Sequence, residues 1–271
     1  MKDIFTAPFL EEMKQTASNM YRLGWAERNG GNISCLLEDR EVAQYLDLNR
    51  VIRTIPMDFE AAALAGKIFI ITGTGKYFKN VESDPESCLS VLRIAADGQN
   101  AEVLWGFKDG GTFTSEFPTH MMSHMARLSV DPTNRVIMHC HPTYTVAMNH
   151  VHELDDRSFT RTLWQTCTEC MAVFPDGIGV LPWMMCGTKE IGRATAEKMK
   201  EYRLVAWGLH GLFSVGKTMD EAFSMIETVE KAAQLYMLYA HLPHKNLIED
   251  HQLVEIANHF GVEYRKDFLN L

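Results

Sequence analysis

The 271-residue sequence has no uninterrupted apolar run of about 18 residues, the length that a membrane-spanning helix needs. Its first residues, MKDIFTAPFLEEMKQ, turn acidic early and have no apolar core of the kind that a secretory signal peptide contains. Clusters of lysine or arginine are also missing, and 26 basic against 35 acidic residues give a net charge of −9. Such a balance disfavours binding to nucleic acid. We therefore expect a cytoplasmic protein without nucleic-acid or membrane partners.

Internal repeats, low-complexity tracts and proline- or serine-rich linkers are absent as well, so nothing in the sequence marks a domain boundary. With 46% hydrophobic residues, a chain of this length can bury a sizeable core. We predict one domain over residues 1–271. The six cysteines are expected to be reduced thiols rather than a disulfide framework, because no signal peptide is evident.

Hydrophobic periodicity predicts alternating helices and strands. Helices are expected over 8–27, 84–93, 116–128, 143–152, 158–167, 187–201 and 219–240, and strands over 32–38, 67–73, 101–107, 135–141, 172–182 and 203–216. Asn29, Gly30 and Gly31 are expected to end the first helix as a C-cap. Several strands follow one another without an intervening helix, which favours an α/β fold with a central mixed, mainly antiparallel sheet flanked by helices.

Two histidines stand one residue apart in VIMHCHPTY, residues 136–144, directly after an apolar run. In a strand, residues two apart point to the same face, so His139 and His141 can share one metal ion. His210, between Gly208 and Gly211 in another strand-like run, is a candidate third ligand. Three neutral imidazoles with an open fourth position are typical of catalytic zinc. The alternative is a pair of hydrogen-bonded core histidines.

A second pair, His120 and His124, lies four apart on a predicted helix but lacks the glutamate of an HExxH zinc site. We interpret it as packing or surface. Cys167 and Cys170 form a lone CxxC, and without a second pair they give little support for a metal site.

Two glycine-bearing loops, RNGGNIS at 28–34 and ITGTGKYF at 71–78, offer backbone N–H groups that could bind an anion. Neither matches a Walker A or a GxGxxG motif, because Tyr77 and Phe78 stand where those motifs need other residues. A helix C-cap for the first loop and a hairpin turn for the second remain equally good explanations. In TFTSEFPTH, residues 112–120, Thr114, Ser115 and Glu116 lie at a predicted helix start, where they could meet an anion or cap the helix.

Taken in order, N29GGN32, T72GTGK76, T114SE116, H139CH141 and His210 resemble the class II aldolase/epimerase family of sugar-phosphate enzymes over nearly the whole chain. The resemblance implies the fold of that family, which adducin-like proteins share. It also implies a homotetramer with active sites at subunit interfaces and a sugar phosphate as substrate. Thr74 departs from the serine that is common in its loop, but it keeps a hydroxyl.

The same resemblance implies the roles of individual residues. By it, zinc is bound by His139, His141 and His210, and substrate phosphate is held by Asn29, Gly31, Asn32, Thr74, Gly75, Thr114 and Ser115. Glu116 would be the base that moves a proton on the carbon of dihydroxyacetone phosphate. Glu169, from a neighbouring subunit, would be a second acid/base at the aldehyde oxygen.

The chemistry agrees with these roles, because cleavage of a ketose 1-phosphate leaves negative charge on an enediolate that a zinc ion can stabilise. No Schiff-base lysine is then needed. An epimerase on the same scaffold, or an adducin-like interaction module without catalysis, remains open at this point. Retention of three histidines and Glu116 argues against the module.

Overall fold

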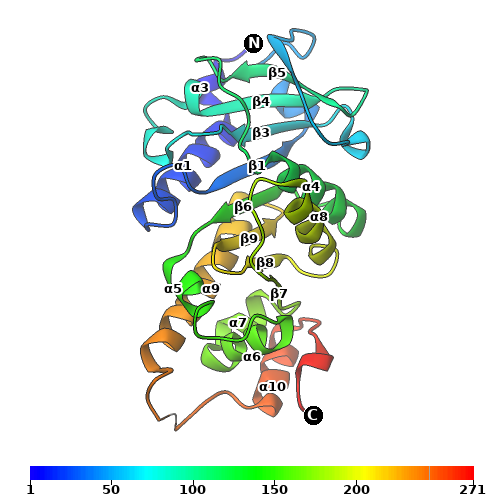
Figure 1. Cartoon of the computed structure of the whole chain (residues 1–271). Coiled ribbons are helices and arrows are strands. Elements are labelled where there is room, and N and C mark those ends of the chain that lie inside the picture. Colours follow the sequence, from blue (N-terminus) through cyan, green and yellow to red (C-terminus); the bar gives the residue numbers. More distant parts are fainter. Residues whose placement is uncertain (244) are drawn as a thin grey trace.

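The computed structural model describes residues 1–243 and 245–271. Nine strands in these residues form one sheet, in the order β2-β5-β4-β3-β1-β6-β9-β8-β7 (Figure 1). The strands are β1 (Asn32–Leu37), β2 (Arg53–Pro56), β3 (Ile68–Thr72), β4 (Leu89–Ile94), β5 (Asn100–Gly106), β6 (Val136–Cys140), β7 (Ile178–Leu181), β8 (Leu204–Trp207) and β9 (Gly211–Gly216). Strands β7 and β8 pair in parallel and the other neighbours are antiparallel. The expected mixed, mainly antiparallel sheet is confirmed.

Helices cover both faces of the sheet. They are α1 (Pro8–Arg22), α2 (Asp39–Val42), α3 (Pro85–Cys88), α4 (Phe117–Val130), α5 (Thr143–Met148), α6 (Asp156–Thr166), α7 (Thr168–Val173), α8 (Lys189–Lys198), α9 (Met219–Tyr239) and α10 (Asp250–Phe260). In Figure 1, α1, α5 and α9 lie on one side and α4 and α8 on the other, while α6, α7 and α10 gather beyond β7. Across residues 1–243 and 245–271, no helix combines the length and apolar character needed to cross a membrane.

Alternation along β6 sends its side chains to two separate cores. Met138 and Cys140 belong to the apolar cluster that includes α1 and α9, whereas Ile137 belongs to the cluster that includes α8. His139 shares the face of Ile137 and lies opposite Asn32 of β1. The start of β1 and the end of β6, in the middle of the sheet, therefore present polar side chains on the face that α4 and α8 cover.

The predicted helix over 84–93 is wrong beyond its first turn. A short helix, α3, ends at Cys88, and residues 89–94 form β4. Successive residues of β4 face different apolar cores: Val91 packs in the core with α1, and Leu92 in the core with α4. Because β4 is buried on both faces, it lacks the alternation of apolar and polar residues that identifies a strand in a sequence.

Three other boundaries differ from the sequence-based prediction. Helix α1 ends at Arg22, so residues 29–31 form a separate loop and not its C-cap. Of the predicted strand 172–182, only Ile178–Leu181 is extended, because α7 occupies the preceding residues and Gly177 turns the chain with φ of 80°. The predicted strand 203–216 is the antiparallel pair β8 and β9 joined by a tight turn.

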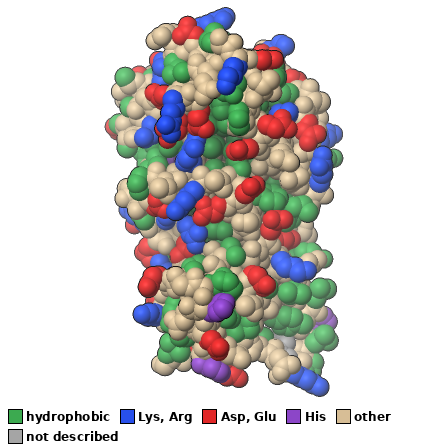
Figure 2. Space-filling model, turned by 180° about the vertical axis from the view of Figure 1, so that it is seen from behind, with side chains coloured by type: hydrophobic (Ala, Val, Ile, Leu, Met, Phe, Trp, Pro, Cys, Tyr) green, Lys and Arg blue, Asp and Glu red, His purple; other side chains and the backbone are tan. Residues whose placement is uncertain are grey.

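Acidic and basic side chains are intermingled over the face of the molecule that Figure 2 shows. Ion pairs join separate segments of the chain, such as Arg203 with Asp176 and Arg93 with Glu102. The acidic excess is therefore not gathered into one patch on this face.

A buried carboxylate on α9 fixes the start of α5, directly after His141 and Pro142. Glu230 accepts hydrogen bonds from the backbone N–H groups of Tyr144 at 2.9 Å and Thr145 at 2.8 Å, and from the Thr145 hydroxyl at 2.7 Å. Because an amide cannot accept all three, Glu230→Gln should lower the free energy of unfolding by about 1–3 kcal/mol.

Urea unfolding measures this loss. The matched control is Glu227→Gln on the exposed side of α9, which should change stability by no more than about 0.5 kcal/mol. Equal losses in the two variants would contradict the role given to Glu230.

Candidate active site

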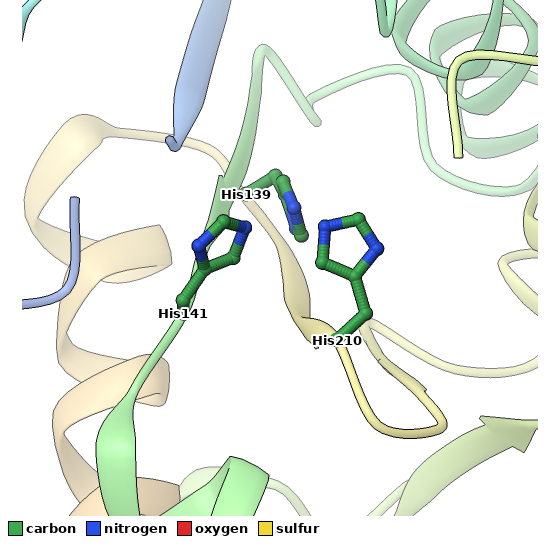
Figure 3. Close-up of side chains that lie close together, drawn as sticks. All are labelled: His139, His141 and His210. Atoms are coloured by element: carbon green, nitrogen blue, oxygen red, sulfur yellow. The ribbon is translucent and has the colours of Figure 1, made fainter. Parts of the chain in front are cut away.

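Three histidines from two segments of the sheet point toward one another (Figure 3). His139 is the last residue but one of β6, His141 directly follows the strand, and His210 lies in the turn between β8 and β9 rather than within a strand. Leu209, with φ of 60°, turns the chain just before His210. The ring centroids are 4.9–5.1 Å apart, and one nitrogen from each ring lies within 4.8 Å of the others. This spacing allows the three rings to share one metal ion.

Hydrogen bonds on the outer side of two rings leave their inner nitrogens free for a metal. His139 Nδ1–H donates to the Leu212 carbonyl at 3.2 Å, and His141 Nδ1 bonds Glu27 Oε1 at 2.8 Å. Nε2 of His139 is buried and has no hydrogen-bond partner within residues 1–243 and 245–271. A buried nitrogen without a partner is costly unless something else, such as a metal ion, occupies that position.

Electrostatics keeps two of these rings neutral, the form that binds metals. Burial, together with the neighbouring His141, lowers the pKa of His139 well below its ordinary value. The same two causes lower the pKa of His210 to about 4. The cluster therefore fits a divalent cation such as zinc.

Two glycines make room for the histidine cluster. A Cβ on Gly30 would lie 2.8 Å from Cε1 of His141, and a Cβ on Gly211 would lie 2.4 Å from the Cys140 carbonyl and 2.8 Å from Cε1 of His139. Such contacts are shorter than real Cβ atoms make. Close approach of the rings thus depends on glycine at both positions.

The predicted anion-binding loops open into the same cavity as the histidines. This cavity, about 160 Å³ in volume, is lined by Asn29, Gly30, Gly31, Asn32, Gly73, Thr74, Gly75, Thr114, Ser115, Glu116, His139, His141 and His210. Thr74 N–H donates to the Thr112 carbonyl at 2.9 Å, and Thr114 N–H donates to the Thr72 carbonyl at 3.1 Å. The second glycine loop is therefore tied to the segment before α4 and is not a hairpin turn between adjacent strands.

Glu116 lies at the N-cap position of α4, but its side chain makes no capping hydrogen bond. The side chain is 6% exposed, and Oε2 has no partner in the described part of the chain. Burial raises the pKa of Glu116 to about 7. A carboxylate oxygen of Glu116 lies within 4.8 Å of a His210 nitrogen and of Cys186 Sγ. Such a carboxyl group is suited to exchange protons near neutral pH.

Glu169 is placed differently from the other predicted site residues. It lies in α7, where Cys167 Sγ–H donates to Glu169 Oε2 at 2.8 Å, and this hydrogen bond lowers the pKa of Glu169. Among the described residues, those that line the cavity do not include it. One chain alone therefore does not bring Glu169 to the histidine cluster.

The structure also bears on the predictions made for the cysteines and for the second histidine pair. The six cysteines are free thiols, as expected. Within residues 1–243 and 245–271, the groups that could hold a metal do not include Cys167 or Cys170. His120 and His124 are buried, so the packing alternative holds over the surface one.

Sequence reasoning missed Glu27 and Cys186. Glu27 lies 114 residues from its partner His141, and no spacing rule connects them. Its place two residues before the NGGN loop is the only signal that the sequence offers.

Comparison with known proteins places this geometry in a family. The family model described as Class II Aldolase and Adducin N-terminal domain matches residues 11–237. Rhamnulose-1-phosphate aldolase of Listeria monocytogenes is 56% identical over 270 residues, covering 99% of both chains. Rhamnulose-1-phosphate aldolase of Escherichia coli O81 is 42% identical and covers 97% of both.

Solved structures agree with the sequence comparisons. The sugar-phosphate aldolase from Thermotoga maritima superposes with a TM-score of 0.75 at 28% identity, over 87% of this chain and 96% of that one. The predicted resemblance is confirmed, and so is the expectation of an enzyme of the aldolase, or lyase, class. This chain belongs to the class II aldolase and adducin family.

Proposed function

We propose that the chain cleaves L-rhamnulose 1-phosphate to dihydroxyacetone phosphate and L-lactaldehyde, in carbohydrate degradation, with zinc at His139, His141 and His210. The observation that carries the proposal is the single cavity that joins three inward-facing histidines, a buried carboxyl group and two glycine loops. The choice of substrate rests on the relatives that share its full length. We propose further that residues 1–271 act as one catalytic domain.

The phosphate would bind at the polar end of the cavity. Backbone N–H groups of the two glycine loops and the side chains of Asn29, Asn32 and Thr74 are the available donors, joined by the hydroxyls of Thr114 and Ser115. They would hold the ketose so that its C3–C4 bond lies beside Glu116. A bound zinc ion would supply Lewis-acid stabilisation of the negative charge that develops on the substrate oxygens.

Glu116 would then perform the proton transfer on the carbon. In cleavage its carboxyl group returns a proton to the enediolate carbon, and in synthesis its carboxylate removes that proton. The desolvated position of Glu116 favours this work, because a pKa near 7 leaves both forms accessible at neutral pH.

The direct test of the reaction is release of dihydroxyacetone phosphate, followed with L-rhamnulose 1-phosphate and L-fuculose 1-phosphate in parallel. The proposal predicts release from both or from the first, with kcat/KM higher by about tenfold or more for the rhamnulose compound. Faster cleavage of the fuculose compound would overturn the substrate assignment. Conversion of substrate without release of dihydroxyacetone phosphate would instead favour an epimerase.

Loss of an anion-binding side chain should act mainly on substrate binding. Asn29→Ala is expected to raise KM by about tenfold with a smaller change in kcat, since a contact to phosphate is similar in the ground and transition states. Steady-state kinetics measures both constants. An unchanged KM would remove Asn29 from the phosphate site.

We propose also that the protein is a ring-shaped homotetramer in which Glu169 of one subunit completes the site of its neighbour. Support comes from the exposed position of Glu169 outside its own chain's cavity. The aldehyde oxygen also needs a proton partner other than Glu116, on the opposite side of the substrate. Glu169→Ala should then retain zinc and phosphate binding but lower cleavage by about 10² to 10⁴.

Mixed oligomers distinguish a neighbour's glutamate from one acting in its own chain. Glu116→Ala and Glu169→Ala chains, mixed in equal amounts and reassembled, should recover about a quarter of the wild-type activity, because one interface in four pairs both intact residues. Absence of recovery in demonstrably mixed tetramers, or a fully active monomer, would contradict the shared site.

A further inference from the structure

A row of four hydrogen-bonded side chains runs from the interior to the cavity. Ser34 Oγ lies 2.8 Å from His124 Nε2 and 2.7 Å from His120 Nδ1, and His120 Nε2 bonds Asn32 Oδ1. The first three side chains are at most 1% exposed, and Asn32 lines the cavity. The cleavage proposed above gives His120, His124 and Ser34 no task.

The row follows from two matching periodicities. Asn32 and Ser34 are two apart on β1 and point to the same face of the sheet. His120 and His124 are four apart on α4, one and two turns after Glu116, and point to one side of that helix. Residues two apart on a strand are separated by about 6.6 Å, and residues four apart on a helix by about 6 Å. The side chains of the two pairs can therefore lie side by side and form hydrogen bonds.

The Ser34 hydroxyl couples the two rings, because its single proton can be donated to only one of them. If Ser34 donates to His120 Nδ1, it accepts from His124 Nε2–H, and His120 Nε2–H is left to donate to Asn32 Oδ1. If Ser34 donates to His124, every bond in the row is reversed and His120 Nε2 must accept from the Asn32 amide. When Ser34 donates to His120, the Asn32 side chain presents its NH₂ group to the cavity. When Ser34 donates to His124, the Asn32 side chain presents its carbonyl oxygen to the cavity.

Both directions require rings that carry one proton each. Burial lowers the pKa of His120 to about 3 and that of His124 well below its ordinary value, so both are neutral at physiological pH. No other acid or base belongs to the row, since Ser34 and Asn32 do not ionise in this range.

We propose that the row runs from His124 through Ser34 and His120 to Asn32, and that it locks the Asn32 amide with its N–H groups toward the substrate phosphate. This inference rests on the proposed function, because only an anionic ligand requires a donor there. His120 is thus a positioning residue: it touches no substrate, and it decides which end of Asn32 the phosphate meets.

Two replacements of His120 separate this role from packing. Glutamine places its amide near the position of Nε2, where it can still donate to Asn32, whereas asparagine reaches only the position of Nδ1 and loses that bond. His120→Asn should weaken binding of inorganic phosphate and raise KM by about tenfold, with the effect mainly on KM, and His120→Gln should keep binding within about threefold of wild type. Zinc content and thermal midpoint of both variants identify any loss of fold.

Neutron diffraction of the zinc-loaded protein with inorganic phosphate observes the protons directly. The proposal predicts a proton on Nε2 and none on Nδ1 in both rings. Protons on Nδ1 of both rings, or equal phosphate affinity in His120→Asn and His120→Gln, would overturn it. Asn29→Ala serves as the reference: if that variant also binds inorganic phosphate normally, the phosphate site itself is wrong, whereas weakened binding there with normal binding in His120→Asn rejects only the row.

Discussion

His139→Ala should yield a folded protein that retains no zinc and cleaves ketose 1-phosphates at least about 10³-fold more slowly than wild type. The ring of His139 supplies the buried Nε2 that has no partner within residues 1–243 and 245–271, and a methyl group cannot replace it as a ligand. Lewis-acid stabilisation is worth several kcal/mol, which sets the size of the loss. Folding should persist because the sheet and the apolar cores do not depend on this nitrogen.

Metal analysis, circular dichroism and the release of dihydroxyacetone phosphate measure the three parts of this result. His150→Ala, at an exposed position outside the cavity, is the matched control and should retain metal and activity. A His139→Ala protein with one zinc per chain would show that the ion binds elsewhere.

Glu116→Gln should lower the rate of cleavage by about 10² to 10⁴ while zinc and phosphate binding persist. The amide fills the space of the carboxyl group but cannot carry the proton. Steady-state kinetics and binding of inorganic phosphate separate these effects. Near-normal kcat in this variant would exclude Glu116 as the base.

The same variant should change the pH dependence of stability in metal-free protein. A carboxyl group whose pKa rises from 4.5 to about 7 on folding penalises the folded state as pH increases through that range. The free energy of unfolding of the wild type should therefore fall between about pH 4.5 and pH 7, by at most on the order of 3 kcal/mol from this group. Glu116→Gln should lack that fall, as urea unfolding across this range would reveal. Bound zinc, a nearby positive charge, should reduce the effect.

Local patterns in the sequence predicted much of the sheet and part of the cavity. Alternation predicted that His139 and His141 point to one side, although His141 lies just beyond the end of β6, and proline in the first turn marked the start of α4 after Glu116. The glycines near His210 identified it as a candidate ligand, but the sequence did not predict that it lies in a turn. The prediction that the two glycine loops together bind phosphate depended on the resemblance to the class II aldolase family, since each loop alone had an ordinary structural explanation.

The failures share a physical cause, which is that long-range contacts override local pattern. Strand β4 is buried on both faces, so its mostly apolar run could not be distinguished from a helix by periodicity. The hydrogen bond of Glu27 to His141 joins residues 114 apart in the sequence, and that of Ser34 to His120 joins residues 86 apart. Contacts of that kind are absent from any local window of sequence.

The central claim is that cleavage requires one zinc ion held by the three histidines. Its most direct test is a titration of metal-depleted protein with zinc, in which release of dihydroxyacetone phosphate from L-rhamnulose 1-phosphate is measured at each addition. We expect no cleavage at the start, a linear rise, and a plateau at about one zinc per chain. Full cleavage by the metal-free protein, or none at saturating zinc, would contradict the claim.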